Sequence, residues 1–428
     1  MSILTPDKDK FGFYEVGNQK TYSKLEALEF KKATGLPINW NFNDRVFENF
    51  NWTIEPAESL EFYYAQRARQ LRQKYDYLVL MYSGGADSSA VLDTFVENNL
   101  FLDEICQYHN LQGENGNKNS WMNEEVFHNS GPRTQVLIDT NPVYKNTVHR
   151  MLDITDLQKN ILNTHDYKFD VWYKTNGYHT PNSLARTHLR ETAEYKKIIE
   201  SGKTVCFIWS VDKPEVVCDD SNNYWFVFTD AKDGQGVTAA TQMLNRDWEH
   251  DEYFFWSPDL PELLCKQGHV VKKFLEKVTS DQVDNIYVGR GTNKSNGIDV
   301  YGRAIDVYGR AIDTSRHMGF TKDPRNTYFL LMPGLNTLIY KNYNPNLVVC
   351  GKPVSTVFSP RDSWFFKANN TEMNQSMYIK GLWEFRKKVK SIDDSMWWEF
   401  KFDPKIAAYS GGMQSMKKKY LLGTGAKK

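Results

Sequence analysis

The side chains best suited to chemistry in this chain stand in one hexapeptide, Ser83-Gly84-Gly85-Ala86-Asp87-Ser88. Its two adjacent glycines permit dihedral angles that side chains forbid and let a ligand approach the main chain closely. The amide N–H groups of such a turn, with the positive end of a following helix behind them, bind anions. The hydroxyls of Ser83 and Ser88 add donors, and the carboxylate of Asp87 can hold Mg²⁺ against phosphate oxygens. The hexapeptide therefore predicts a site for a polyphosphate with its metal ion.

The residues on either side of the hexapeptide support this prediction. The run 78–82 before it is short, apolar and uncharged, which is typical of a strand buried on both faces. The stretch after it carries an apolar stripe at helical spacing, made of Val91, Leu92, Phe95 and Val96. We therefore expect the hexapeptide on a strand-to-helix turn. A tight turn with a helix-capping Asp87 is the alternative, and this strand–turn–helix context favours the phosphate site.

The segment from Tyr82 to Ser89 resembles the pyrophosphate-binding loop of the PP-loop ATP pyrophosphatases, also called adenine nucleotide alpha hydrolases. It is most similar to the loop in the synthetase domain of asparagine synthetases. The resemblance implies cleavage of ATP between its α- and β-phosphates, adenylation of a substrate oxygen and release of pyrophosphate. It also implies ATP and Mg²⁺ as cofactors, bound by Ser83, Gly84, Gly85, Asp87 and Ser88. A helical segment ahead of the loop further resembles PP-loop proteins of tailed phages.

The length of 428 residues predicts two or three domains. Residues 1–76 are expected to form a helical N-terminal segment, with its clearest helix over 58–75. Residues 77–232 alternate strands with helices, which predicts an α/β domain with a parallel sheet and helices on both faces. Residues 233–428 are expected to be α+β or mainly helical and to determine substrate specificity.

The strands expected after 78–82 are 104–109, 135–139, 204–210 and 224–230. In parallel sheets ligands bind beyond the carboxyl ends of the strands, so residues just past each strand form the candidate site. Besides the hexapeptide, these residues are Tyr108, His109, Asp139, Asp212, Lys213 and Asp230.

Asp212 and Lys213 are predicted catalytic residues beside Asp87. A lysine directed at the leaving pyrophosphate would lower the barrier, because negative charge develops there. The carboxylate of Asp212 would share the metal ion with Asp87. The alternative is an exposed turn stiffened by Pro214.

Two further pairs are open to two interpretations each. Tyr108 and His109 are candidates to flank the adenine or the ribose, or they are ordinary surface residues. Arg186 and Arg190 stand four apart on a predicted helix. They either hold a substrate phosphate or carboxylate, or they pair with acidic neighbours on the surface.

Lys plus Arg and Asp plus Glu both number 53, and this zero net charge argues against a protein that coats nucleic acid. A local contact with nucleic acid stays open. The helix at 58–75 carries a basic set that is either solvated or meets a polyanion: Arg67, Arg69, Arg72 and Lys74. The basic tail 417–419 is likewise either a frayed terminus or a contact to nucleotide or nucleic acid.

The chain is expected to be cytoplasmic and to have no membrane partner. Its first residues lack the apolar core of a signal peptide, and it contains no apolar stretch long enough to span a bilayer. Its five cysteines have no spacing typical of a disulfide framework, so reduced thiols are expected.

The residues that are missing narrow the comparison with the family. No N-terminal cysteine and no glutaminase domain precede the loop, so a separate donor of ammonia or amine is expected. No Cys-x-x-Cys occurs, which departs from the iron–sulfur thiolases and the zinc-bearing members. The leading hypothesis is a ligase that adenylates a carboxylate or carbonyl of a small acceptor for amide or C–N bond formation. The alternatives are an enzyme that modifies a tRNA or DNA base, and an ATP-binding module without turnover.

Overall fold

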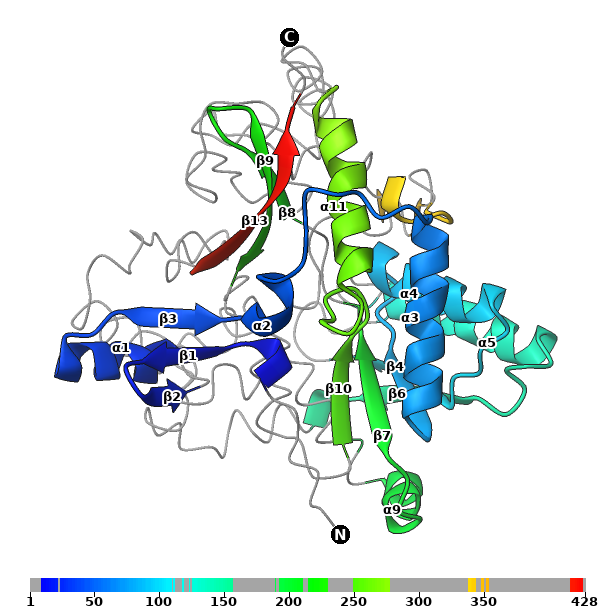
Figure 1. Ribbon diagram of the computed structural model, residues 1–428. Helices are drawn as coiled ribbons and strands as arrows, with labels where there is room; N and C mark the ends of the chain where they lie inside the picture. The colour runs from blue at the N-terminus through cyan, green and yellow to red at the C-terminus, as the bar shows by residue number, and fades with distance from the viewer. Residues whose placement is uncertain are drawn as a thin grey trace, which may run out of the picture.

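The computed structural model describes residues 9–21, 24–109, 111, 118, 123, 125–156, 189, 192–210, 215–229, 249–277, 338–343, 348–349, 352–353 and 416–425. The strands of this described part form four sheets, and the largest of them has five strands. Figure 1 shows how the helices and strands are arranged around that sheet.

The five-stranded sheet is parallel and has the strand order β10-β7-β4-β5-β6. Its strands are β4 (Tyr77–Met81), β5 (Glu104–His109), β6 (Val148–Asp153), β7 (Val205–Trp209) and β10 (Glu249–Tyr253). Every residue of β4 and β7 is buried, which explains why unbroken apolar runs predicted both strands correctly. The expected α/β class with a parallel sheet is confirmed.

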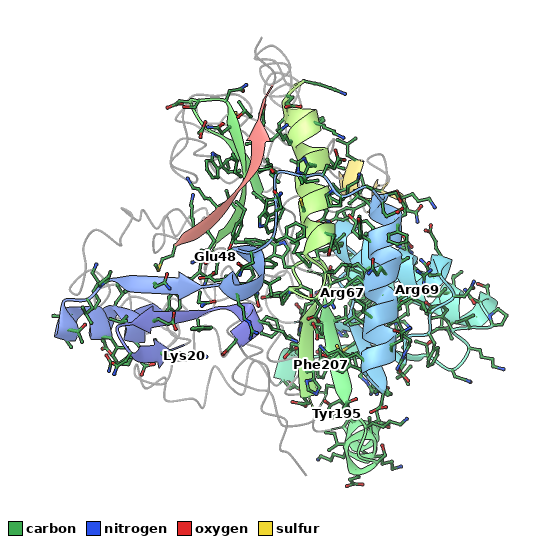
Figure 2. All side chains as sticks on the ribbon, viewed as in Figure 1. Lys20, Glu48, Arg67, Arg69, Tyr195 and Phe207 are labelled. Atoms are coloured by element: carbon green, nitrogen blue, oxygen red, sulfur yellow. The ribbon has the colours of Figure 1, made fainter. Side chains whose placement is uncertain are left out.

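Helices lie on both faces of this sheet. They include α3 (Leu60–Lys74), α4 (Ala86–Glu97), α5 (Gly131–Thr140) and α9 (Ala193–Glu200). Helix α11 (Pro261–Leu275) follows β10 in the sequence and packs against α3. Glu252 of β10 pairs in register with Ile208 of β7, so both side chains point to one face, and there Glu252 contacts Arg67 of α3. Phe207 points to the opposite face, where its ring lies 6.3 Å from the ring of Tyr195 on α9 (Figure 2).

The predicted strand at 135–139 is wrong, because these residues belong to helix α5. Pro132 stands in the first turn of this helix, and Val136 is 60% exposed. A short apolar run does not by itself distinguish a buried strand from a helix. The strand that occupies the expected place is β6, a mostly exposed edge strand with the polar sequence Val-His-Arg-Met-Leu-Asp.

The predicted strand at 224–230 exists as β9 (Asn223–Thr229), but it does not join the parallel sheet. It lies between β8 (Glu215–Cys218) and β13 (Lys417–Thr424) in a separate antiparallel sheet. The basic tail is therefore a paired strand rather than a frayed terminus, and Lys418 Nζ lies 2.6 Å from the Asp44 carboxylate. The parallel sheet takes its fifth strand, β10, from beyond the predicted boundary at 232.

The N-terminal segment, expected to consist of helices and loops, contains the expected helix over 58–75 as α3 but also contains strands. Three short strands there form an antiparallel sheet in the order β2-β1-β3: β1 (Phe13–Val16), β2 (Gln19–Thr21) and β3 (Ile38–Asn41). A 3-10 turn η1 (Asp9–Phe11) precedes them, and helices α1 (Lys24–Thr34) and α2 (Asp44–Phe47) accompany them. Strands of three or four residues are too short to show the two-residue alternation that identifies a strand in a sequence.

An aromatic cluster joins the N-terminal segment to the antiparallel sheet of β8, β9 and β13. Trp52 stacks on Tyr420 with ring centroids 4.8 Å apart, and Phe47 stacks on Phe228 at 5.2 Å. Stacked aromatic pairs of this kind contribute about 0.5–1.5 kcal/mol beyond the apolar area they bury. Described residues near both ends of the sequence, from Phe11 to Leu422, are thus packed into one hydrophobic core.

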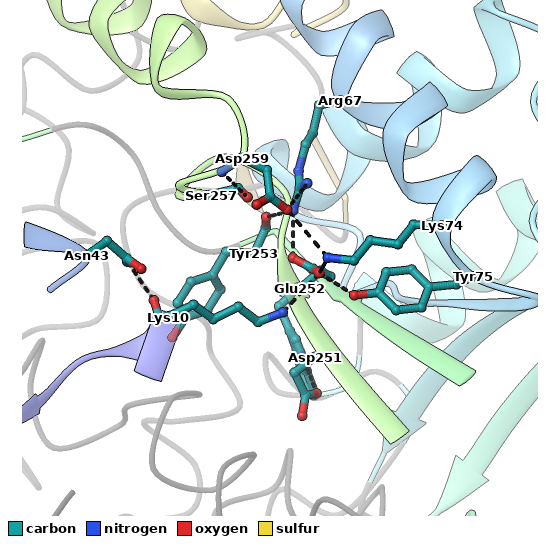
Figure 3. Close-up of polar contacts among 11 residues, drawn as sticks. Lys10, Asn43, Arg67, Lys74, Tyr75, Asp251, Glu252, Tyr253, Ser257 and Asp259 are labelled. Atoms are coloured by element: carbon teal, nitrogen blue, oxygen red, sulfur yellow. Dashed lines mark hydrogen bonds and ion pairs between the residues drawn. The ribbon is translucent and has the colours of Figure 1, made fainter. Parts of the chain in front are cut away.

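A buried set of charges holds α3 against β10 (Figure 3). Glu252 is 1% exposed, and its carboxylate oxygens form ion pairs with the side-chain nitrogens of three cations: Lys10 at 2.9 Å, Arg67 at 2.8 Å and Lys74 at 3.1 Å. The hydroxyl of Tyr75 donates a further hydrogen bond to the same carboxylate. Burial by itself would raise the pKa of Glu252, but the three cations outweigh it and hold that pKa well below its ordinary value of 4.5.

The basic face of α3 is thus only partly solvated. Arg67 is fully buried in the contacts just described, and Arg72 pairs with Asp103 at 2.6 Å. Arg69 points to the other side of the helix from Arg67 (Figure 2) and donates to the Asn98 side chain at 2.9 Å.

Among the described helices, none has the length and apolar character needed to cross a bilayer.

Candidate functional site

The hexapeptide forms the predicted strand-to-helix turn: Ser83–Gly85 follow β4, and Ala86–Ser88 form the first turn of α4. β4 is the middle strand of the parallel sheet, with β5 on one side and β7 on the other. From β4 the chain builds the sheet outward through β5 and β6, and it then returns to add β7 and β10 on the other side. Ligands of open α/β sheets bind at such a change of direction, in the crevice outside the carboxyl ends of the strands.

Gly84 gives the loop its shape. Its φ of +87° is a conformation that side chains rarely adopt, and a Cβ at this position would lie 2.7 Å from Ser130 Cβ. The main chain can therefore pass close to the segment before α5, whose Asn129 side chain donates to the Gly84 carbonyl at 3.3 Å. Gly85 is the N-cap of α4, with an ordinary φ of −70° and no side chain to cover the helix end.

The two serine hydroxyls bond mainly within the loop. Ser83 Oγ lies 3.0 Å from Ser88 Oγ and accepts the Gly85 amide at 3.3 Å. Ser88 Oγ accepts the Gly84 amide at 3.1 Å, and Ser88 is only 1% exposed. Ser88 is therefore placed to hold the turn together, whereas the sequence predicted that it faces the ligand. Ser83 is partly exposed, and its role as a donor to the ligand stays a prediction.

Asp87 stands in the first turn of α4 and is partly exposed. The amide groups of a first helical turn have no acceptor within the helix, and the helix dipole makes this end positive. A carboxylate beside such amides suits a ligand that combines an anion with a divalent cation. Oδ1 of Asp87 accepts a hydrogen bond from the hydroxyl of Tyr340, a residue that the sequence analysis did not single out.

The described residues supply too few ligands to bind Mg²⁺ by themselves, but they could bind it together with the phosphate oxygens of a nucleotide. Among them, no group of three or more His, Cys, Asp and Glu side chains is gathered to hold a metal ion. Mg²⁺ is usually bound through one or two carboxylates together with substrate phosphates and water, so the single carboxylate of Asp87 fits this role with a nucleotide present. The second predicted ligand, Asp212, lies outside the described residues, as do Lys213, Asp230, Arg186 and Arg190.

A cation that the sequence analysis missed supports the same turn from α5. Arg133 is 39% exposed at its side chain, pairs with Asp93 of α4, and donates to the Tyr82 hydroxyl at 3.2 Å. Burial raises the pKa of Tyr82, so this hydroxyl stays neutral and accepts the bond. Arg133 went unnoticed because its segment was predicted to lead into a strand.

Three other predicted positions differ from expectation. Tyr108 and His109 end β5 as foreseen, but each is only 8% exposed, so the interpretation as ordinary surface is wrong. His109 packs its ring against Phe127 at 4.8 Å and lies 3.6 Å from the Asp153 carboxylate. Asp139 lies on α5 rather than at a strand end, and its carboxylate accepts the Gln135 amide at 2.9 Å.

Gly84→Ala is expected to destabilise the protein by roughly 2–5 kcal/mol. The left-handed conformation contributes about 1–2 kcal/mol of this, and the displaced Ser130 contributes about 1–3 kcal/mol. Gly85→Ala is the matched control, because its φ suits any residue, and it should cost less than about 1 kcal/mol. Urea unfolding of both variants measures the difference, and equal losses would contradict the assigned geometry of Gly84.

Comparison with known proteins adds no relative, since no family model, no curated protein and no solved structure matches the chain. Its class therefore follows from its own fold and site. The protein is an α/β protein with a five-stranded parallel sheet. A glycine turn, followed by a helical turn that contains Asp87, lies after the central strand β4, from which the chain adds strands first on one side and then on the other.

Proposed function

We propose that this chain is a PP-loop ATP pyrophosphatase that adenylates the carboxylate or carbonyl oxygen of a small acceptor. An amine or ammonia from a separate donor then displaces AMP and forms an amide or C–N bond. One observation carries the proposal: the positive-φ turn at Gly84 leads directly into the first turn of α4. This turn follows β4, the strand at which the order of strands in the sheet reverses. This is where a polyphosphate would find main-chain amides and the positive end of a helix.

The residues have distinct roles in this proposal. The main-chain amides of the first turn of α4, after Gly85, and the hydroxyl of Ser83 hold the phosphates that leave as pyrophosphate. Asp87 holds Mg²⁺, which neutralises negative charge on the phosphates. Ser88 keeps the turn in shape through its bonds to Ser83 and the Gly84 amide. Lys213 and Asp212 remain proposed to stabilise the leaving group and to share the metal ion.

The alternative of a nucleic-acid-modifying enzyme loses part of its support. It rested on the arginine-bearing helices, of which α3 is described and the one with Arg186 and Arg190 is not, and on the basic tail. Arg67 and Arg72 are used in internal ion pairs, and Lys418 is used in a contact to Asp44. A salt-dependent affinity for RNA or DNA would restore this alternative.

Product analysis with α-labelled ATP tests the proposal. The protein is incubated with labelled ATP, Mg²⁺, pooled amino acids, ammonia and RNA, and the labelled products are separated. Formation of AMP together with pyrophosphate is expected, and fractionation of the pool then identifies the acceptor. Labelled ADP as the product would contradict the proposal. Tight binding of ATP with no turnover on any fraction would favour a binding module.

A further inference from the structure

A short segment from the C-terminal part of the chain lies against the helix that carries Asp87. The segment, Leu338–Tyr343, belongs to the yellow part of the chain near the start of α3 in Figure 1. Its contacts to α4 run from Asp87 in the first turn to Glu97 at the last residue. The segment Leu338–Tyr343 thus packs along α4, although the two are about 250 residues apart in the sequence.

Tyr340 makes the contact that bears on the site. It is 2% exposed, and its hydroxyl donates a hydrogen bond to Asp87 Oδ1. Its ring lies 5.7 Å from the ring of Phe255, in the loop that follows β10. The hydroxyl is therefore held in place by packing and is not carried on a loose surface side chain.

The main chain on either side of Tyr340 is also held. The carbonyl of Ile339 accepts the hydroxyl of Tyr64 at 2.8 Å, and Gln267 of α11 in turn donates to that hydroxyl at 2.9 Å. On the other side, Asn342 donates to the Glu97 carboxylate at 2.9 Å, and Lys341 lies 3.4 Å from it. Contacts with α3, α4 and α11 together determine where the Tyr340 hydroxyl lies.

A carboxylate oxygen has two lone pairs, so a hydrogen bond to Asp87 leaves the group able to bind a cation as well. Carboxylates that bind metal ions are commonly oriented by such a bond, because a fixed rotamer loses less freedom when the ion binds. We propose that Tyr340 is a positioning residue for the Mg²⁺ of the nucleotide site, acting through Asp87. This inference rests on the proposed function and assigns to the region beyond residue 277 a part in metal binding.

The test measures binding without turnover. The full chain is titrated with α,β-methylene-ATP by calorimetry over a series of Mg²⁺ concentrations, and once in EDTA. Tyr340→Phe is expected to raise the Mg²⁺ concentration needed for half-maximal affinity by roughly tenfold or more. The affinity of Tyr340→Phe for the analogue in EDTA should equal that of the wild type. A general loss of structure would lower this affinity as well, so the measurement separates the two causes.

Tyr343→Phe is the matched control, since it removes a hydroxyl from the same segment at a residue that packs on the core from its edge. It should keep the wild-type Mg²⁺ dependence. If Tyr340→Phe does not fold, Tyr64→Phe replaces it with the same expectation, because this change releases the Ile339 carbonyl.

Two failures are distinguishable. A wild-type protein that binds the analogue neither with Mg²⁺ nor without it overturns the proposed function, and the role of Tyr340 falls with it. A wild-type protein that binds with Mg²⁺, beside a Tyr340→Phe variant with an equal or lower Mg²⁺ requirement, overturns only the role of Tyr340.

Discussion

Asp87→Ala is expected to reduce the formation of AMP and pyrophosphate from ATP at least about 100-fold, a loss typical of removing one charge-stabilising group from an active site. The reason is the position of the carboxylate in the first turn of α4, directly after the glycine turn. Among the described residues, no group of three or more His, Cys, Asp and Glu side chains offers another metal site. Thin-layer separation of products from α-labelled ATP measures the loss.

Asp139→Ala is the control for this experiment. The sequence placed Asp139 at a strand end near the site, whereas the structure places it on α5 with Gln135. Its activity should equal that of the wild type. Asp87→Ala should also stay folded and lose about 1–3 kcal/mol of stability, because it removes the acceptor of the Tyr340 hydroxyl from a partly exposed position. Undiminished turnover in folded Asp87→Ala would refute the assigned role of Asp87.

Glu252→Gln is expected to cause the largest loss of stability, about 3–5 kcal/mol at neutral pH. The substitution keeps the shape of the side chain but removes the carboxylate that Lys10 and Arg67 share, and Arg67 retains only Asp259, at 3.6 Å. Removing one member of a buried ion pair is more harmful than removing both, because the remaining charge stays out of water. Urea unfolding at constant salt measures the change in free energy.

The same variant should change the dependence of stability on pH. The folded-state pKa of Glu252 lies below its ordinary value of 4.5, so the folded protein binds fewer protons at this group than the unfolded chain does. Its contribution is therefore complete above pH 4.5 and is lost as the pH falls further. The wild type should lose stability over this range, and Glu252→Gln should lose less.

Glu97→Gln provides the matched control, because it makes the same chemical change in an exposed ion pair. The Glu97 side chain is 41% exposed and that of Lys341 is 61% exposed. Exposed pairs contribute roughly 0–1 kcal/mol, so the loss should fall in that range. Similar losses for Glu252→Gln and Glu97→Gln would show that the charges around Glu252 do not hold α3 to β10.

Local patterns were sufficient for β4, the glycine turn and α4. Their signals lie within a few residues of one another: an apolar run, adjacent glycines and an apolar stripe at helical spacing. The positive φ of Gly84 follows the same logic, since a turn this tight requires a residue without a side chain. The parallel sheet was also predictable, because strands alternate with helices along the sequence.

The pairing of distant strands could not be predicted from local patterns. β6 is a polar edge strand, and β9 has the apolar composition of a parallel strand yet pairs antiparallel with β13 from the end of the chain. Which strand pairs with which depends on burial in the folded molecule, and composition alone does not reveal it.

The sequence by itself determined the candidate site, because a phosphate-binding turn is built from consecutive residues. Only the tertiary structure decided what surrounds that turn. Arg67 looked like part of a solvated face until Glu252, 185 residues away, was found beside it, and Tyr340 reaches Asp87 across 253 residues. Contacts over such separations form when the chain packs, and no local spacing of residue types encodes them.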